Sequence, residues 1–314
     1  MTARVLVTCL HLQRHLERYA ERFEMHRVEV ETPEVVQQMR EAELLPIIGR
    51  FDGMVAGDDE ITAQVLEAGR PRLRVVSKWG IGIDSIDQEA ARRLEIAVYN
   101  TPGALGDEVA DVIIGYLVLL ARRLHAMDRS VREDGWLKPQ GISLRGKRLG
   151  VIGIGSIGAA VVRRGHVLGM EVIGYDPIEI GADLRRQTGL AMVTIDELLA
   201  TSDFVSLCCP LTPDTKHLVD ASALARMKPG AYLINTARGG LIDEPALVEA
   251  LVTGRLAGAA LDVFETEPLP VESRLRQLDG VILGTHNASN TLEAVLRVNE
   301  MAIANLFRGL GIDA

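Results

Sequence analysis

The sequence predicts an α/β protein built from two Rossmann-like domains, each with a parallel sheet. Short apolar runs alternate with helical segments along the chain, which is typical of parallel strands joined by crossover helices. The length of 314 residues exceeds the usual size of one domain and favours two. A glycine-rich turn also lies between a strand and a helix in the second half of the chain.

The composition restricts the partners and the location of the protein. A net charge of -9 argues against binding to a nucleic-acid backbone or to an anionic membrane surface. The most apolar run, residues 112–121, is shorter than the roughly 20 residues that span a bilayer, so we expect a buried or interface helix there. We see no signal peptide, and three cysteines without a CxxC pair suit a reducing cytoplasm.

The first third of the chain contains four predicted strands, at residues 4–8, 53–57, 73–77 and 96–100. Thr32, followed by Pro33, predicts a helix start, because threonine caps helices and proline suits the first helical position. A long helix from about Gly106 to Arg123 is a possible connection to the second domain.

A second series of strands begins at Lys147. Its members are predicted at 147–155, 171–177, 203–209, 231–237, 256–264 and 280–286. A helix over 156–169 follows the first of them, and proline or glycine stands at nearly every junction. The second half of the chain is therefore another α/β unit.

The turn after the first strand of this series has the pattern GxGxxG, formed by Gly153, Gly155 and Gly158. Its first glycine permits a tight turn, the second lets the backbone approach a pyrophosphate, and the third allows close packing of helix on strand. The pyrophosphate would bind the amides at the helix N-terminus, at Ser156 and Ile157. A glycine-rich turn with a purely structural role is the alternative interpretation.

Asp176 ends the next strand, at about the 20-residue spacing typical of dinucleotide sites. Its carboxylate would accept hydrogen bonds from ribose hydroxyls and would repel a 2′-phosphate. Pro177 and Ile178 follow it, and no arginine does. We therefore predict NAD as the cofactor.

Hydride transfer at an alcohol carbon needs a group that moves a proton, and one histidine is well placed for that role. His286 follows a predicted strand, where ligands bind in open α/β sheets, although a lone histidine is equally often structural. Glu267 precedes Pro268, which favours an extended backbone, and a carboxylate bonded to an imidazole fixes its tautomer. Arg238 in "NTARGGLID" is either a surface residue or the partner of an anionic ligand, and its two glycines suggest backbone close to a cofactor.

From about Leu73 onward, the chain contains in order the motifs "SKWGIGIDSID", "NTPG", "GVIGIGSIG", "PLTPDT", "INTARGGLIDEPAL", "ALDVFETEP" and "HNASNT". In the order and spacing of these motifs it resembles the D-isomer-specific 2-hydroxyacid dehydrogenases, the family of phosphoglycerate dehydrogenase, glycerate dehydrogenase and hydroxypyruvate reductase. The resemblance implies that Arg238 binds the substrate, that Glu267 is the carboxylate partner and that His286 is the catalytic acid and base.

The resemblance also assigns the residues that line the binding sites. Asp262 would contact the nicotinamide amide, and the cofactor site would be lined by Cys209, Pro210, Thr236 and Ala237. The substrate carboxylate would be held by the backbone amides of a loop made of Lys78, Trp79, Gly80, Ile81 and Gly82. No metal site is expected.

The same resemblance implies a discontinuous domain layout. Residues 1–103 and 286–314 would form a flavodoxin-like substrate-binding domain, and residues 104–285 would form the NAD-binding Rossmann domain. The implied protein is a homodimer that interconverts a small anionic D-2-hydroxy acid and its 2-oxo acid. Alternatives are an NADH-binding scaffold like the related corepressors, or a family dehydrogenase for an unusual substrate such as a sugar acid or phosphite.

Some positions depart from the family pattern. Ser85 replaces an asparagine and Thr285 replaces the proline before the histidine. Lys78 and Trp79 replace the arginine and small residue common in phosphoglycerate dehydrogenases. The Trp79 indole would either reshape the substrate pocket or pack in the core.

Overall fold

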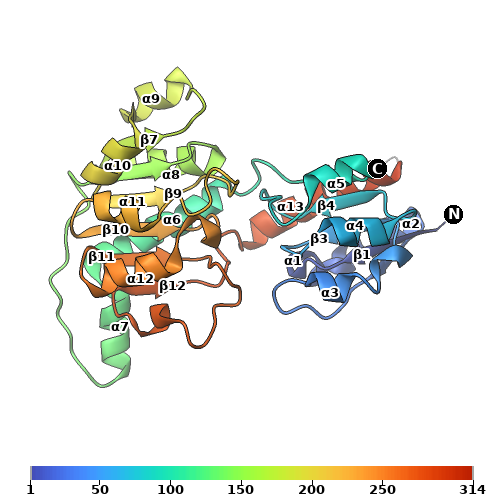
Figure 1. Cartoon of the computed structure of the whole chain (residues 1–314), viewed down its shortest axis with the longest axis horizontal. Helices are drawn as coiled ribbons and strands as arrows, with labels where there is room; N and C mark the ends of the chain where they lie inside the picture. The colour runs from blue at the N-terminus through green and yellow to red at the C-terminus, as the bar shows by residue number, and fades with distance from the viewer. Residues whose placement is uncertain (1, 313–314) are drawn as a thin grey trace. The chain divides into compact units, whose positions relative to one another are not determined.

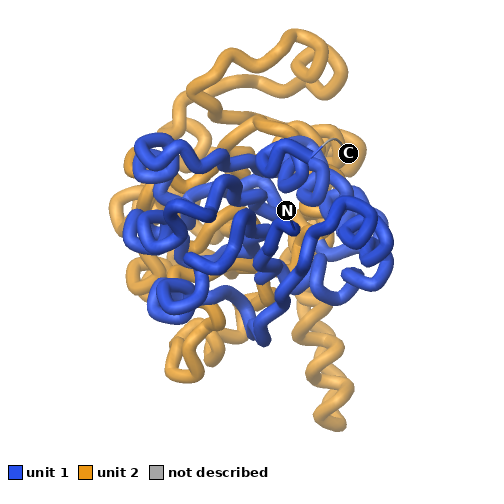
Figure 2. Tube along the Cα trace, turned by 90° about the vertical axis from the view of Figure 1, so that its right-hand side faces the viewer, with its two compact units in different colours: residues 1–104, 290–314 blue, residues 105–289 orange. Residues whose placement is uncertain are grey.

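The computed structural model describes residues 2–312. The chain forms two compact units: unit 1 comprises Met1–Ala104 and Asn290–Ala314, and unit 2 comprises Leu105–Ser289 (Figure 2). From the sequence, we expected the chain to return to the first unit at residue 286. The boundary falls after Ser289, so His286 belongs to unit 2.

Unit 1 contains a five-stranded parallel sheet with the strand order β2-β1-β3-β4-β5 (Figure 1). The strands are β1 (Ala3–Val7), β2 (Val28–Glu31), β3 (Gly53–Ala56), β4 (Val75–Lys78) and β5 (Ala97–Tyr99). This order is that of flavodoxin-like folds. The sequence patterns located β1, β3, β4 and β5, but they missed β2, because its "VEVE" alternates valine with glutamate and is not a continuous apolar run.

Short helices and one long C-terminal helix complete unit 1. The short ones are α1 (Leu10–Gln13), α2 (Ala20–Met25), α3 (Glu41–Leu44), α4 (Ala63–Gly69) and α5 (Gln88–Arg93), with 3-10 turns at Leu16–Tyr19 and Ile48–Arg50. The long helix, α13 (Leu292–Leu310), packs on β3 and β4. A methyl group at Gly309 would overlap the Val75 side chain, so only glycine allows this close packing.

The helix predicted to start at Thr32 is absent, and this prediction was wrong. Residues 32–40 contain no regular secondary structure, and the next helix begins at Glu41. Tertiary hydrogen bonds hold the segment instead: Gln13 Nε2 donates to the Pro33 carbonyl, and Met39 N–H donates to Asp59. These long-range bonds outweigh the local preference for a helix start.

Unit 2 contains a seven-stranded parallel sheet with the order β12-β11-β10-β9-β6-β7-β8. Its strands are β6 (Arg148–Ile152), β7 (Glu171–Tyr175), β8 (Ala191–Met192), β9 (Phe204–Leu207), β10 (Ala231–Asn235), β11 (Leu256–Leu261) and β12 (Val281–Leu283). The order reverses between β6 and β9, as in Rossmann folds, where ligands bind at such a reversal. Only the two-residue β8 was missed by the sequence patterns.

The helices of unit 2 connect these strands. They are α6 (Gly106–Arg122), α7 (Leu124–Arg132), α8 (Ser156–Val167), α9 (Ala182–Thr188), α10 (Ile195–Thr201), α11 (Ala221–Arg226) and α12 (Glu244–Val252), with 3-10 turns at Gly239–Leu241 and Arg274–Gln277. The predicted apolar helix is α6, which packs along α8. Within residues 2–312, no helix is long and apolar enough to cross a bilayer.

Several helices in both units begin at a side chain that accepts a hydrogen bond from an amide of the first turn. These N-caps are Thr62, Asp87, Thr194, Asp220, Asp243 and Thr291. Such caps satisfy amide groups that have no partner inside the helix, so the sequence determines the helix starts locally.

Candidate active site

The candidate site residues of unit 2 follow neighbouring strands of its sheet. The loops after β12, β11, β10, β9 and β6 contain His286, Glu267, Arg238, Cys209 and Gly153. Because the strands are parallel, all these loops lie at the carboxyl edge of one sheet. The strand order therefore gathers residues that are far apart in the sequence.

The glycine-rich turn requires glycine at its first and third positions. Gly153 has φ +90°, and a Cβ there would lie 2.6 Å from the backbone nitrogen of Cys209. A Cβ at Gly158 would overlap the carbonyl oxygen of Gly153. The first glycine thus allows the turn to pass close to the β9 loop. The third glycine allows α8 to pack against the turn.

The second glycine has a different environment. Apart from its chain neighbours and the adjoining helix backbone, no atom of residues 2–312 lies within 4 Å of a Cβ placed on Gly155, so the structure leaves space there. Gly155 is the N-cap of α8 and supplies no capping side chain. Amide groups at Ser156 and Ile157 begin this 12-residue helix. Helix N-termini of this kind bind phosphate groups, so the turn fits a dinucleotide pyrophosphate.

Asp176 lies directly beside the glycine-rich turn. One carboxylate oxygen accepts a hydrogen bond from Ile154 N–H at 2.7 Å, and the other accepts one from Ile178 N–H at 2.8 Å. These two bonds hold the carboxylate at the end of β7, and among residues 2–312 no lysine or arginine forms an ion pair with it. The acidic group is therefore oriented by the backbone on both sides.

His286 and Glu267 form a hydrogen-bonded pair. The His286 Nδ1 atom lies 2.7 Å from Glu267 Oε2, and the other glutamate oxygen accepts the Phe264 N–H at 3.0 Å. The backbone N–H of His286 donates to the Asp262 carbonyl at 2.6 Å, and the residue has φ +53°. With Nδ1 engaged, the Nε2 atom of the ring is the one directed to other partners.

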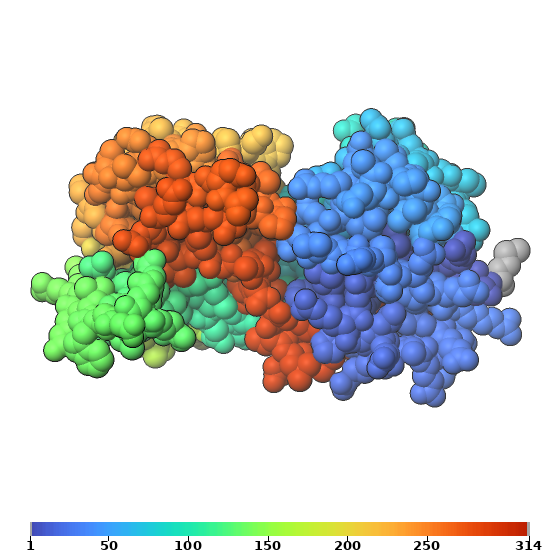
Figure 3. Space-filling view, turned by 90° about the horizontal axis from the view of Figure 1, so that it is seen from below, coloured from blue at the N-terminus to red at the C-terminus, as the bar shows by residue number. Residues whose placement is uncertain are grey.

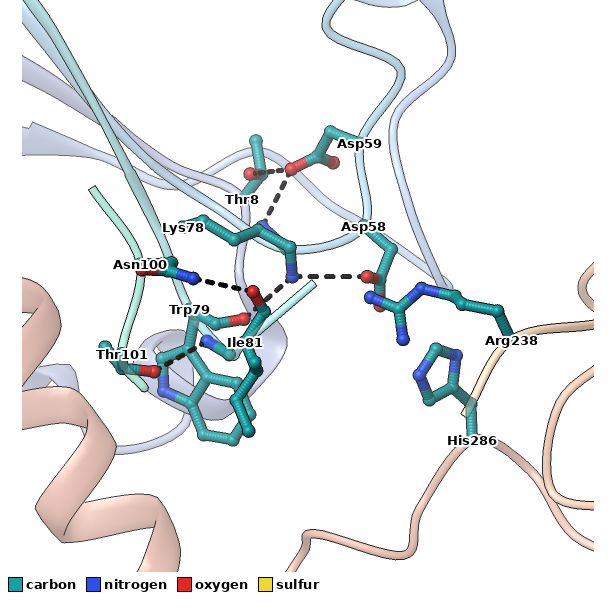
Figure 4. Close-up of polar contacts among 12 residues, drawn as sticks. Thr8, Asp58, Asp59, Lys78, Trp79, Ile81, Asn100, Thr101, Arg238 and His286 are labelled. Atoms are coloured by element: carbon teal, nitrogen blue, oxygen red, sulfur yellow. Dashed lines mark hydrogen bonds and ion pairs between the residues drawn. The ribbon is translucent and has the colours of Figure 1, made fainter. Parts of the chain in front are cut away.

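Hydrogen bonds within its own loop hold Arg238 in place. Asn235 donates through Nδ2 to the Arg238 carbonyl at 2.8 Å and accepts the Ala237 N–H at 3.0 Å. The guanidinium donates to the Ala237 carbonyl at 2.8 Å. Figure 4 shows the Arg238 guanidinium and the His286 ring pointing toward each other. The sequence analysis did not single out Asn235, although it lies in the same "INTAR" motif as Arg238.

Gly239, the residue after Arg238, packs on the peptide bond between Phe264 and Glu265. A Cβ at Gly239 would overlap that peptide, whereas one at Gly240 would be 3.1 Å from a Leu211 methyl group. We expected these glycines to lie near a cofactor. That expectation is not tested by this contact. Glycine is required at position 239 because its loop packs on the segment that leads to Glu267, and this contact couples the positions of Arg238 and Glu267.

Asp262 is buried and accepts two hydrogen bonds. Its Oδ2 accepts from Ala288 N–H at 2.8 Å, and its Oδ1 lies 3.4 Å from the Tyr116 hydroxyl. Burial is the main cause that raises the pKa of the Tyr116 phenol, and the negative charge of Asp262 raises this pKa further. Tyr116 therefore stays protonated and donates to Asp262. The sequence analysis did not identify Tyr116 as a site residue, because it lies in α6, far from any recognised motif.

The remaining cofactor candidates lie after β9 and β10. Cys209 is half-buried, and burial raises the pKa of its thiol to about 11, so the thiol is uncharged at neutral pH. Pro210 is exposed, and its carbonyl accepts the Thr215 hydroxyl at 2.7 Å. Thr236 is buried and Ala237 is half-buried.

A second histidine–glutamate pair lies next to the Arg238 loop. His217 Nε2 is 2.6 Å from Glu265 Oε1, and the His217 N–H donates to the Gly240 carbonyl at 2.8 Å. In the sequence, His217 directly follows the polar stretch "PLTPDTK". The pairing depends on the β11–β12 loop, 48 residues further along the chain, and no local pattern signals it.

In unit 1 the loop 78–82 follows β4. Gly80 has φ +113°, and its N–H donates to the Thr101 hydroxyl at 3.1 Å. The Ile81 carbonyl accepts from Asn100 Nδ2 at 2.7 Å (Figure 4). Among residues 2–312, no hydrogen-bond partner is found for the backbone N–H of Ile81 or Gly82. Both amides are free to bind an anion.

The Lys78 and Trp79 side chains of this loop are both buried in unit 1. The indole Nε1 donates to Asn299 Oδ1 of α13 at 2.7 Å, and the ring stacks on His11 with centroids 4.4 Å apart. Of the two interpretations of Trp79, core packing describes this environment.

The Rossmann topology, the glycine-rich turn with its acidic neighbour, and a histidine–carboxylate pair at the same sheet edge are typical of a dinucleotide-dependent oxidoreductase. The sequence model of the D-isomer specific 2-hydroxyacid dehydrogenase, NAD binding domain, matches residues 114–288. The chain belongs to this family. It is an NAD(P)-dependent 2-hydroxyacid dehydrogenase.

Individual relatives cover almost the whole chain. It is 38% identical to a hydroxypyruvate reductase from Thermotoga maritima, over 96% of this chain and 98% of that protein. It is 39% identical to a D-3-phosphoglycerate dehydrogenase from Synechocystis, over 83% of this chain but only 47% of that protein. A solved glyoxylate reductase from Paecilomyes thermophila has a TM-score of 0.84 and 30% identity, over 97% of this chain and 94% of that one.

Proposed function

We propose that this enzyme uses NAD to interconvert a small D-2-hydroxy acid and its 2-oxo acid, with His286, Glu267 and Arg238 as its catalytic residues. The substrate type is that of the hydroxypyruvate and glyoxylate reductases or of the phosphoglycerate dehydrogenases. The 2.7 Å contact between His286 and Glu267 carries the proposal, because it prepares one imidazole nitrogen for proton transfer.

In the direction of reduction, the bound nicotinamide supplies a hydride to the 2-carbon of the oxo acid. His286 Nε2 donates the proton that the resulting oxygen requires, while Nδ1 stays bonded to Glu267. Arg238 binds the carboxylate and polarises the carbonyl through its planar guanidinium. The free amides of Ile81 and Gly82 bind the carboxylate. In oxidation, His286 takes the proton back.

Asp176 supports NAD rather than NADP as the cofactor. Its carboxylate lies beside the glycine-rich turn, and residues 177–181 contain no lysine or arginine that could bind a 2′-phosphate. Asp262 is proposed to contact the nicotinamide amide, and Cys209, Pro210, Thr236 and Ala237 to line the cofactor site. Unit 2 is then the NAD domain, and unit 1 the substrate-binding domain.

A homodimer formed through unit 2 is the proposed assembly. The segment after α6 exposes several large apolar side chains on the surface of this unit, drawn in green in Figure 3: Leu124, Val131, Trp136 and Leu137. Such a grouping is typical of a surface that meets a partner. Free thiols at all three cysteines support a cytoplasmic location.

A substrate panel tests the proposal. Purified protein is mixed with NADH or NADPH and with glyoxylate, hydroxypyruvate, 2-oxoglutarate or phosphohydroxypyruvate, and the loss of reduced-nicotinamide absorbance is followed. We expect turnover with NADH and at least one of these acids. Binding of NADH without turnover of any 2-oxo acid would contradict the proposed catalytic assignment.

A further inference from the structure

The Lys78 ammonium is the only cation in the loop 78–82, and it is directed toward the protein interior. Its Nζ atom lies 3.1 Å from Asp58 Oδ1 and donates to the Trp79 carbonyl at 2.8 Å (Figure 4). The side chain is only 4% exposed. Lys78 therefore binds the backbone of the loop and a neighbouring carboxylate, and it does not extend toward solvent.

The Lys78 ammonium lies next to Gly80 in the loop. A Cβ at Gly80 would lie 3.5 Å from Lys78 Nζ, so the charge lies against the inner side of the turn. The hydrogen bond to the Trp79 carbonyl holds the peptide between Trp79 and Gly80, which directly precedes the amides of Ile81 and Gly82. Lys78 thus acts on a ligand of this loop through the orientation of the backbone.

The other segments at this edge of the unit 1 sheet add no positive charge. Residues 8–9, 32–34, 57–60 and 100–102 follow β1, β2, β3 and β5, and they contain carboxylates but no lysine or arginine. Asp58 compensates the charge of Lys78, and the fully buried Asp59 lies next to it in sequence, bonded to Thr8 and Gly57. The free loop amides can bind one carboxylate, but no cation of these segments remains for a second anionic group.

We propose that the substrate is a 2-oxo acid without a phosphate group, and that Lys78 is a positioning residue of the carboxylate-binding loop. This inference rests on the proposed function and chooses between its two substrate types. A phosphate dianion would lose hydration on binding, and residues 8–9, 32–34, 57–60 and 100–102 offer no lysine or arginine to replace it. A neutral hydroxymethyl group or a hydrogen atom at the end of the substrate away from the carboxylate needs no charged hydrogen-bond donor.

The first test compares hydroxypyruvate and glyoxylate with phosphohydroxypyruvate in the wild-type enzyme. We expect kcat/KM for the better unphosphorylated acid to exceed that for phosphohydroxypyruvate by about 100-fold or more, since the phosphate lacks a charge-assisted partner. Equal or better turnover of phosphohydroxypyruvate would overturn the inference and leave the proposed function standing. No turnover of any 2-oxo acid would overturn both.

Two variants separate positioning by Lys78 from direct phosphate binding. Lys78→Met should raise KM for both acids by a similar factor and leave their ratio unchanged, because it disturbs the loop that holds their common carboxylate. A selective loss with phosphohydroxypyruvate would show that Lys78 binds the phosphate. Asp58→Asn should shift the ratio toward phosphohydroxypyruvate by about 10-fold, since it removes the charge that compensates Lys78.

Controls keep the test interpretable if the buried Lys78 variant does not fold. Glu67→Gln removes an exposed carboxylate that pairs with Arg93 in the same unit, and its substrate ratio should equal that of the wild type. Circular dichroism and thermal melting report folding of each variant. Should Lys78→Met be unfolded, the wild-type ratio and the Asp58→Asn shift still decide the question, and an unchanged ratio in Asp58→Asn would contradict charge compensation.

Discussion

The Nδ1 atom of His286 lies 2.7 Å from Oε2 of Glu267, and the other oxygen of this glutamate is bonded to the backbone of Phe264. The carboxylate is thus fixed at one oxygen and orients the imidazole with the other. His286→Ala removes the proposed proton donor, and we expect turnover to fall by about 10²- to 10⁴-fold while NADH still binds. Steady-state kinetics and NADH fluorescence titration measure the two effects.

A matched control exists in α8. His166 is exposed in the last turn of that helix, and His166→Ala should retain wild-type turnover. If His286→Ala kept more than about a tenth of the wild-type kcat, its role as the acid and base would have to be abandoned.

Arg238→Lys keeps the positive charge but loses the planar pair of donors. Because a point charge cannot bind a carboxylate and polarise a carbonyl at once, we expect kcat/KM for the 2-oxo acid to fall by about 100-fold or more. Affinity for NADH should be unchanged. Wild-type kinetics in this variant would show that the guanidinium geometry is irrelevant.

Gly239→Ala tests whether the contact between two loops positions Arg238 and Glu267. The added methyl group would overlap the peptide between Phe264 and Glu265, and we expect a loss of about 1 to 3 kcal/mol in the free energy of unfolding together with reduced kcat. Gly240→Ala is the control, since its methyl group would meet only the end of the Leu211 side chain at 3.1 Å. Chemical denaturation compares the two. Equal stability of both variants would contradict the predicted overlap.

Asp176→Ala should relax the preference for NADH over NADPH. Removing a carboxylate beside the proposed ribose site removes repulsion of the 2′-phosphate, and we expect the ratio of kcat/KM with NADH to kcat/KM with NADPH to fall by about 10-fold or more. Equal use of both cofactors by the wild type would refute the role given to Asp176.

The thiol of Cys209 should react slowly with iodoacetamide at neutral pH. Burial raises its pKa from 9.0 to about 11, so the folded protein binds this proton more tightly than the unfolded chain does. The associated stability is complete below pH 9 and is lost as the pH rises through about 11. Mass spectrometry of the alkylated peptide at several pH values follows the reaction. Fast labelling at pH 7 would contradict the assigned environment.

Most of the two sheets could be predicted from the sequence. The patterns of β6, α8 and β7 are local, since a glycine-rich turn and a terminal aspartate lie within one strand–helix–strand unit. The N-caps of α12 and α13 are local as well. The start of a helix at Thr32 was predicted by the same kind of rule and was wrong, because Gln13 and Asp59 bind the segment from elsewhere in the chain.

The sequence by itself determined the fold class, the dinucleotide fingerprint with Asp176, and the identity of Arg238, Glu267 and His286 as residues with suitable chemistry. Only the tertiary structure decided which partners these and other side chains have. Trp79 bonds to Asn299, which lies 220 residues away, Lys78 binds Asp58 within the protein, and Gly239 contacts the peptide after Phe264. Burial and ion pairing arise from contacts between strands and helices that are distant in the sequence. Local sequence patterns therefore cannot predict them.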